Sequence, residues 1–429
     1  MLCRNTQKAI MEPSLDNSRS RVLTFVMTIE YNGFAYAGFQ RQAATPRDVN
    51  GSIRSPSKSN ASDVKKTSPR KRPNPSISAP KRATKARTPI TVQQQIENVL
   101  EQWTNLSIAA MRVRGAGRTD KGVHATGQVV AFDVPLDLLQ LKKENTEGSV
   151  SNGKEYLSVH ALPLLQEAYR LFCSSRADAN ENKQSSKDEP KPFLDHWRIR
   201  RAISTRLPPD IAIRSIWIWV GDFPFEARQI ILRKKYIYKL RFRALAHVDH
   251  DDGDNPTIHP ICTAGPYLLR RSHDQNNVWI CHWPLDEAIL PAACQAFVGV
   301  NDFTRFVHNE EQKKRSKSKR DDEYSNIIDL LRFDVHLERG DDDQSTLIPP
   351  VWDATFTLLA RGFRRQMVRN LVGCVVDVAR GIKTVDDLLI LLRNDDTNII
   401  EANMVVNAAP ACGLCLEHVI YGHNHFMTA

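Results

Sequence analysis

A short segment, residues 115 to 125, has the side chains best suited to chemistry. It reads Gly-Ala-Gly-Arg-Thr-Asp-Lys-Gly-Val-His-Ala and lies between two apolar, strand-like runs, 111–114 and 128–132. Charged groups between buried strands cost free energy on folding, so their presence there indicates a function. Glycines let the backbone turn tightly beside a bulky ligand. The pattern predicts one carboxylate, Asp120, at a sheet edge beside a cation, where it can attack an electrophilic carbon. The alternative is that Asp120 caps a helix beginning near Val123.

The residues from Arg118 to Ala125 resemble the signature of the TruA family of tRNA pseudouridine synthases. That signature is an Arg-Thr-Asp triplet, one variable residue, then Gly-Val-His and a small residue. Other stretches resemble further family elements in the same order, and together they span residues 27 to 416, with Phe39 where Trp is usual. These stretches are Ile29–Gly33 with Ala37–Gln42, Leu207–Ile211, Phe225–Arg228 with Lys235–Tyr238, Asn301–Phe306, and Gly362–Gly373.

The resemblance implies an enzyme that detaches the uracil of a uridine, rotates it and rejoins it through carbon. It implies that Asp120 is the nucleophile, attacking either the sugar or the base. Arg369 would be its positive partner, which would keep the carboxylate ionised. Tyr236 would stack on the uracil and help to remove the C5 proton. Tyr238 points the same way along the strand, so the residue pattern alone leaves the two tyrosines as alternatives.

The resemblance also implies the substrate and its contacts. Arg118 would fill the space that a flipped-out nucleotide vacates, where a guanidinium offsets the loss of stacking. Arg41, Lys121, His124 and Arg228 are further candidates for binding RNA. The expected targets are uridines 38 to 40 in the anticodon arm of tRNA. Two alternatives stay open: a family member acting on positions 27 and 28 or on other RNAs, which Lys121 favours, and a non-catalytic RNA-binding protein on this fold.

Interleaved strand and helix patterns indicate an α+β protein. The strands are expected at 22–31, 111–114, 128–132, 211–220, 235–242, 327–337, 352–359 and 414–421, and the helices at 92–103, 159–173, 287–297, 362–380 and 384–393. The resemblance implies two pseudo-symmetric, RRM-like lobes that share a mixed, mainly antiparallel sheet around a central basic cleft. The expected organisation is a flexible leader at 1–21, an N-terminal catalytic lobe at 22–222 and a C-terminal lobe at 223–429.

Two polar insertions are expected within the N-terminal lobe, at 44–91 and 174–192. Residues 44–91 hold 12 Lys and Arg against 2 Asp and Glu, a net charge of +10, which equals the net charge of the whole chain. Such a composition cannot maintain a packed core, so we expect disorder there. This insert could contact phosphates, act as a nuclear import signal around residues 69–72, or be a solvated segment without a specific role.

Several other classes of function are disfavoured by the sequence. No run of 18 apolar residues exists, so no membrane span is expected, and the eight scattered cysteines indicate reduced thiols inside a cell. Cys412 and Cys415, with histidines nearby, suggest zinc only weakly, because no second pair exists. We expect no metal and no cofactor, tRNA as the partner, and a homodimer by resemblance. Nucleus, organelle and cytoplasm stay open as locations.

Overall fold

The structure, a computed structural model, describes most of the chain apart from its leader and several connecting segments. The described residues are 22–41, 90–140, 156–181, 193–219, 225–245, 269, 271, 276–308, 326–340, 349–393 and 404–422. The leader expected at 1–21 and residues 44–89 of the expected basic insert lie outside them.

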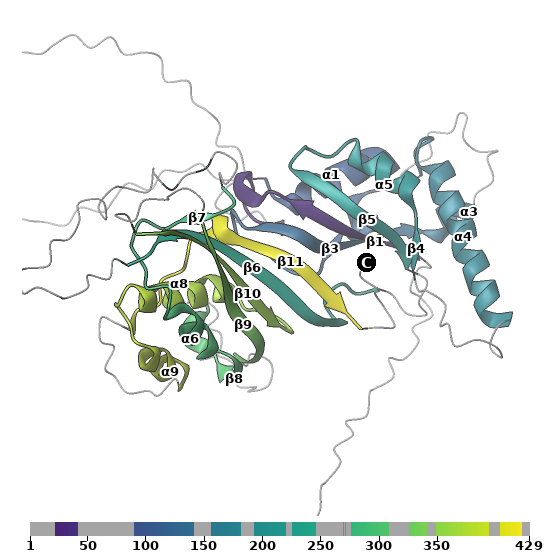
Figure 1. Cartoon of the computed structure of the whole chain (residues 1–429). Coiled ribbons are helices and arrows are strands. Elements are labelled where there is room, and N and C mark those ends of the chain that lie inside the picture. Colours follow the sequence, from purple (N-terminus) through teal and green to yellow (C-terminus); the bar gives the residue numbers. More distant parts are fainter. Residues whose placement is uncertain are drawn as a thin grey trace, which may run out of the picture.

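One eleven-stranded sheet runs through the described chain (Figure 1). Nine strands lie in the order β4-β5-β1-β3-β11-β6-β10-β9-β8, while β2 pairs with β3 and β7 with β6. The β3–β11 and β6–β7 pairs are parallel and the other pairs of described strands are antiparallel. The bounds are β1 Val22–Tyr31, β2 Arg114–Gly115, β3 His124–Pro135, β4 Phe193–Asp195, β5 Ile211–Trp219, β6 Ile231–Arg243, β7 Trp279–Ile280, β8 Gly299–Asp302, β9 Ile327–Arg339, β10 Val351–Ala360 and β11 Leu414–Tyr421. An α+β fold with a mixed, mainly antiparallel sheet is thus confirmed.

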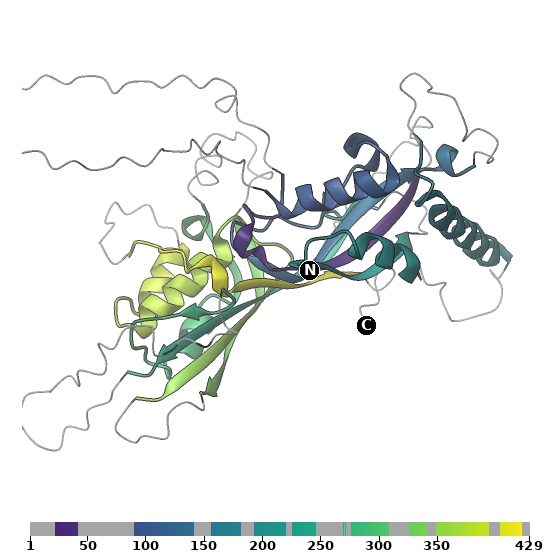
Figure 2. The same ribbon diagram turned by 90° about the horizontal axis from the view of Figure 1, so that it is seen from above.

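Helices pack against both halves of this sheet (Figures 1 and 2). Helices α1 and α5 lie with the half that contains β5, β1 and β3, whereas α6, α8 and α9 lie with the half that contains β6, β10 and β9. The bounds are α1 Val92–Thr104, α2 Ile108–Met111, α3 Leu136–Gln140, α4 Leu162–Glu181, α5 Trp197–Ser204, α6 Leu290–Gln295, α8 Met367–Ala379 and α9 Val385–Arg393, with 3-10 helices η1 Gly33–Ala35, η7 Thr304–Phe306 and η9 Ala411–Gly413.

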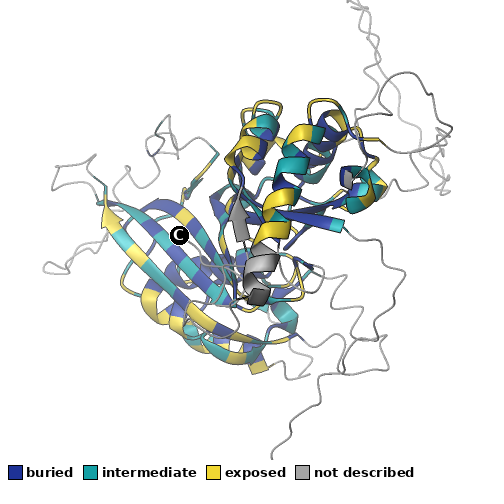
Figure 3. Ribbon diagram, turned by 90° about the vertical axis from the view of Figure 1, so that its right-hand side faces the viewer, coloured by how far each residue is buried: buried dark blue, intermediate teal, exposed yellow. Residues whose placement is uncertain are grey.

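Local sequence explains these elements. In β10 the even positions from Ala354 to Ala360 are buried and the odd positions between them are half-buried, as expected of a strand with one face on a core. Helix α8 is apolar around most of its surface and almost wholly buried, which is typical of a helix inside a core. Figure 3 shows buried residues running along the strands and on the helices that cover them. In both halves of the sheet, buried apolar residues of the strands therefore pack against those of the covering helices.

The described residues on either side of residues 42–89 are hydrogen-bonded to one another. Thr91 accepts a hydrogen bond from the backbone N–H of Gln94 at 3.3 Å and so begins helix α1. The backbone N–H groups of Ala37 and Val92 donate to the carbonyls of Ile90 and Gly38, at 3.0 and 3.2 Å. The turn after β1 and the start of α1 are therefore held side by side.

Most expected elements are confirmed, and three expectations are wrong. Residues 111–114 are not a strand: a short helix ends at Met111, and only Arg114 with Gly115 pairs with β3. The helix expected from residue 362 begins at Met367, because residue 366 adopts a left-handed conformation, with φ 62°, that ends the preceding turn. Helix α4 continues to Glu181, into the segment assigned to the second polar insert.

The two halves of the sheet meet at the parallel β3–β11 pair. Its register aligns Cys415 with His124 and Leu416 with Ala125. On its other side, β11 runs antiparallel to β6 and aligns Leu416 with Tyr236. The join therefore lies directly after the segment 115–123, and it brings that segment beside the aromatic strand β6.

Candidate active site

The segment 115–123 is held by side chains that bind its backbone. Three successive carbonyls each accept a hydrogen bond: Gly115 from Arg228 Nε at 3.2 Å, Ala116 from Lys234 Nζ at 3.0 Å, and Gly117 from Gln128 Nε2 at 2.9 Å. Two of these donors belong to the 225–243 region and one to β3. Both halves of the sheet therefore fix the direction in which the chain approaches residue 118.

The next part of the segment is fixed from β1 and the turn that follows it. The hydroxyls of Tyr31 and Thr119 are hydrogen-bonded at 2.8 Å, and the backbone N–H of Phe39 donates to the carbonyl of Thr119 at 3.2 Å. Gly38 has a φ of 103°, and a Cβ there would lie 2.6 Å from the Thr119 carbonyl oxygen. A glycine is thus required at position 38.

His124 ties the end of the segment to the same turn. Its Nδ1 accepts a hydrogen bond from the backbone N–H of Gly33 at 3.2 Å, and its Nε2 makes no hydrogen bond within the described residues. Burial lowers the pKa of His124, against an opposing effect of the backbone at Asn276 and Cys412. The imidazole is therefore neutral at pH 7 and acts here as a tether, while its predicted contact with RNA stays a prediction.

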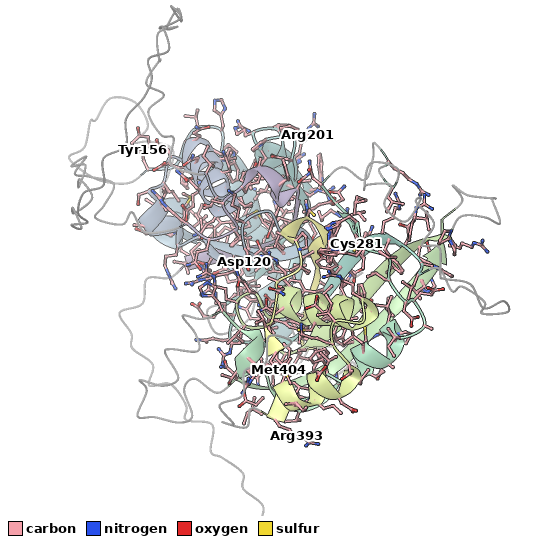
Figure 4. The ribbon with its side chains drawn as sticks, turned by 90° about the vertical axis from the view of Figure 1, so that its left-hand side faces the viewer. Asp120, Tyr156, Arg201, Cys281, Arg393 and Met404 are labelled. Carbon is pink, nitrogen blue, oxygen red and sulfur yellow. The ribbon has the colours of Figure 1, made fainter. Side chains whose placement is uncertain are left out.

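Asp120 lies where the two halves of the protein meet (Figure 4). Its carboxylate side chain is 27% exposed, and its Oδ1 is 3.7 Å from Arg365 Nε. The residue is not the cap of a helix. The chain turns at residues 120–123, where the Val123 N–H donates a hydrogen bond to the Asp120 carbonyl, and then continues directly into β3. A solvent-accessible carboxylate beside a guanidinium is the arrangement that the sequence predicts, with a different arginine.

Arg369 is in α8, but its contacts are to the backbone. Its Nε donates to the carbonyl of Ala409 at 2.6 Å, and the Ala409 N–H donates back to the Arg369 carbonyl at 3.0 Å. Among the ion pairs of the described residues, Asp120 is paired with Arg365 and not with Arg369. The expected direct pairing is thus replaced in this structure, and the catalytic role of Arg369 stays a prediction.

Tyr236 is the tyrosine of β6 that lies near Asp120. Burial raises its pKa well above the ordinary value, and the negative charge of Asp120 raises it further. Its ring meets Phe363 edge-on, with centroids 5.2 Å apart. Tyr238 instead donates its hydroxyl to the carbonyl of Pro410 at 2.8 Å. The structure therefore separates two tyrosines that the sequence left as alternatives.

The remaining residues predicted to bind RNA are exposed on the surface. Arg118 is exposed and donates to the side chain of Gln40, which also accepts from Arg228 at 3.4 Å. Arg41 pairs with the buried carboxylate of Glu97 at 3.2 Å, and Lys121 is exposed. Arg118, Arg228 and Gln40 are thus brought together, while Arg41 is attached to helix α1.

Metal ligation and membrane insertion have little support among the described residues. No group of three or more His, Cys, Asp or Glu side chains is close enough there to hold a metal ion, and His423 and His425 lie outside the described range. Burial raises the pKa of the thiols of Cys412 and Cys415, the latter to about 11, so both are protonated at pH 7. No described helix combines the length and apolar character of a membrane span.

Lys234 is a site residue that sequence reasoning missed. It stands two positions before Tyr236 in β6, so the alternation of the strand places it on the same face as Tyr236, although a lysine is ordinarily exposed. Instead its Nζ is directed at the segment 115–123, only 2.5 Å from where a Cβ on Gly117 would lie. Burial, followed by the nearby positive charge of Arg228, lowers the pKa of Lys234 to about 8.

This lowered pKa predicts a specific dependence of stability on pH. An exposed lysine in the unfolded chain titrates near pH 10.4. Between about pH 8 and pH 10 the unfolded chain binds more protons than the folded protein, so Lys234 makes the unfolding free energy rise with pH, by up to about 1 kcal/mol per pH unit. We expect the slope of unfolding free energy against pH to be lower in Lys234→Met than in wild type by about this contribution, and unchanged in Lys239→Met, on the exposed side of β6. Denaturant unfolding across this range measures both, and equal slopes in Lys234→Met and wild type would contradict the assignment.

The family model and the relatives that this chain matches carry the same description. Residues 293–422 match a family model described as tRNA pseudouridine synthase. The chain is 25% identical to tRNA pseudouridine synthase A of Thermodesulfovibrio yellowstonii over 331 residues, which cover 77% of this chain and 90% of that protein. It is 26% identical to tRNA pseudouridine synthase A of Maridesulfovibrio salexigens (77% and 82% covered) and 24% identical to tRNA pseudouridine synthase A 1 of Bacillus cereus (78% and 90% covered).

Proposed function

Because the chain belongs to the TruA family of tRNA pseudouridine synthases, we propose that it isomerises uridine to pseudouridine in tRNA, with uridines 38 to 40 as targets. The observation that supports this best is the placement of Asp120: a partly exposed carboxylate, paired with an arginine and adjoining a buried tyrosine. The two lobes assigned to residues 22–222 and 223–429 would enclose the RNA. In support, β4, β5, β1 and β3 come from the first segment, and β11, β6, β10, β9 and β8 from the second.

The proposed reaction uses groups of the chain and the substrate. Asp120 attacks the nucleoside and the N-glycosidic bond breaks, so that the uracil is free to rotate. When C5 bonds to C1′ of the sugar, the bond between Asp120 and the nucleoside breaks and the carboxylate is released. The C5 proton then leaves by way of the Tyr236 hydroxyl, and N1 takes up a proton. Arg118, exposed beside Asp120, occupies the space left by the flipped nucleotide. Lys121 and Arg228 contact the phosphates around it.

A direct assay tests this function. The full-length protein is incubated with unmodified tRNA transcripts, and pseudouridines are mapped by carbodiimide modification and primer extension. We expect modification at positions 38 to 40. Modification at 27 or 28 instead would identify the alternative branch that Lys121 favours, and RNA binding without any pseudouridine would support the non-catalytic alternative. The same preparation, analysed by size exclusion with light scattering, tests the proposed homodimer.

A Tyr236 variant tests how the C5 proton leaves. Because its raised pKa keeps the Tyr236 hydroxyl protonated at pH 7, this group relays a proton and does not act as a free phenolate. We expect Tyr236→Phe to lower the single-turnover rate by about 100-fold while tRNA affinity stays near wild type, since the ring is retained. Tyr238→Phe, which loses a hydrogen bond to the backbone, is the control and should lose stability more than rate. If Tyr236→Phe has the wild-type rate, the hydroxyl does not relay the C5 proton and Tyr236 only stacks on the uracil.

A further inference from the structure

The turn at residues 362–366 meets both candidate catalytic groups. Phe363 packs edge-on against Tyr236, and two residues later Arg365 Nε lies 3.7 Å from Asp120 Oδ1. We propose that Arg365 is a positioning residue for the proposed reaction, which holds the Asp120 carboxylate in the direction from which it meets the nucleoside. This inference rests on the proposed function and adds a residue to it.

The backbone of this turn is held firmly where Arg365 leaves it. The N–H of His308 donates to the Arg365 carbonyl at 3.2 Å, and the N–H of Met367 donates to the Arg364 carbonyl at 3.2 Å. Gln366 follows with a φ of 62°, a left-handed conformation that costs a residue with a side chain about 1 kcal/mol. Such strain persists where surrounding contacts fix the chain, and it often occurs at functional sites.

A second set of contacts fixes the same turn to η7. Asn370 donates its backbone N–H to the carbonyl of Gln366 at 3.0 Å, and its side-chain amide donates to the carbonyl of Phe306 at 2.7 Å. Asn370 is buried. The turn is therefore anchored to the core of the C-terminal half. From it, the guanidinium of Arg365 reaches the carboxylate of Asp120, which belongs to the N-terminal half.

Exposure indicates what this ion pair contributes. The side chains of Arg365 and Asp120 are 50% and 27% exposed, and water screens such pairs, so they add little to stability. We therefore expect Arg365 variants to fold normally. An ion pair at 3.7 Å that orients the carboxylate matters more for catalysis, because a displacement of about 1 Å of a reacting group can lower a rate about 100-fold.

Kinetics distinguish positioning from a plain phosphate contact. At saturating enzyme, Arg365→Ala is expected to lower the single-turnover rate by about 10-fold to 100-fold, with the tRNA Kd and its salt dependence near wild type. Arg365→Lys should recover part of the rate, since it keeps the charge but not the geometry. Arg364→Ala, which removes the same charge from the adjacent exposed position, is the matched control and should keep the saturated rate. If Arg365→Ala keeps the rate and instead reduces the slope of log Kd against log salt by about 0.7 to 0.9, Arg365 binds phosphate and the inference is wrong.

A spectroscopic measurement tests the contact without any turnover. The ¹⁵Nε resonance of Arg365, assigned from its loss in Arg365→Lys, should shift in Asp120→Asn and stay in place in Glu226→Gln, which alters a carboxylate paired with Arg112. An unmoved resonance in Asp120→Asn overturns the inference whether or not the wild type modifies tRNA. A shifted resonance in a wild type that forms no pseudouridine would instead reject the proposed function and leave the pairing intact.

Discussion

Asp120→Asn is expected to abolish pseudouridine formation while tRNA binding persists. The amide is nearly the same size as the carboxylate, so the turn at 120–123 and its hydrogen bond from Val123 to the Asp120 carbonyl are preserved. An amide is a very poor nucleophile compared with a carboxylate, and the loss of such a group lowers rates by about 10⁴-fold or more. Single-turnover assays with radiolabelled tRNA measure the rate, and filter binding measures the affinity.

The matched control for this variant is Asp210→Asn. Asp210 accepts a hydrogen bond from the Tyr36 hydroxyl at 2.6 Å and tests whether the loss of any nearby carboxylate has the same effect. We expect it to keep the rate within about 10-fold of wild type, since the amide oxygen of asparagine can still accept the Tyr36 hydrogen bond. If Asp120→Asn keeps more than about 1% of the wild-type turnover, Asp120 is not the nucleophile and another group attacks the nucleoside.

Gly33→Ala is expected to have the largest combined effect on stability and activity. A Cβ at residue 33 would lie 1.8 Å from the backbone oxygen of Val123 and 2.5 Å from its carbonyl carbon. Neither atom is at the end of a flexible side chain, so η1 and the segment 115–123 must separate. We expect a loss of about 3 kcal/mol in unfolding free energy and a fall of about 100-fold in rate, because Asp120 moves with the segment.

Denaturant unfolding and single-turnover rates measure the two effects of this substitution. Gly340→Ala is the control, because the nearest atom to its added Cβ would be 3.4 Å away, an ordinary contact. It should cost under about 1 kcal/mol. If Gly33→Ala unfolds like wild type, then η1 and the segment 115–123 are not in contact in solution as described.

Much of the fold was predictable because its strands and helices have strong periodic patterns. The bounds of β1 and β11 were predicted to the residue, since both are apolar runs that end at clear breaks. The start of α8 was not, because the pattern of apolar residues continues back through Phe363, and the left-handed residue 366 that interrupts it is a glutamine, for which no turn is expected. Likewise, α4 continues beyond its apolar residues into a polar stretch.

The site was predictable where its residues are adjacent in sequence, and less so where contacts cross between halves. Asp120 and Arg118 stand in one signature, and the resemblance identified them directly. Lys234 and Arg365 contact that segment from elements more than a hundred residues away, and nothing in their spacing reveals the register that brings them there. The partner expected for Asp120 was Arg369, four residues beyond the arginine that contacts it; Arg365 lies in the turn before α8, whereas Arg369 lies within the helix and donates to a backbone carbonyl.

The position of β11 has a consequence for biosynthesis. This strand is the last of the described strands to leave the ribosome, yet it lies in the middle of the sheet, between β3 and β6. Until residues 414–421 have been translated, the nascent protein has two partial sheets with open edges, each prone to wrong pairing. The Asp120 turn and the Tyr236 strand can come together only after this strand inserts between them. A growing chain is therefore unable to act on RNA, and a stop codon before residue 414 should give an aggregation-prone product without activity.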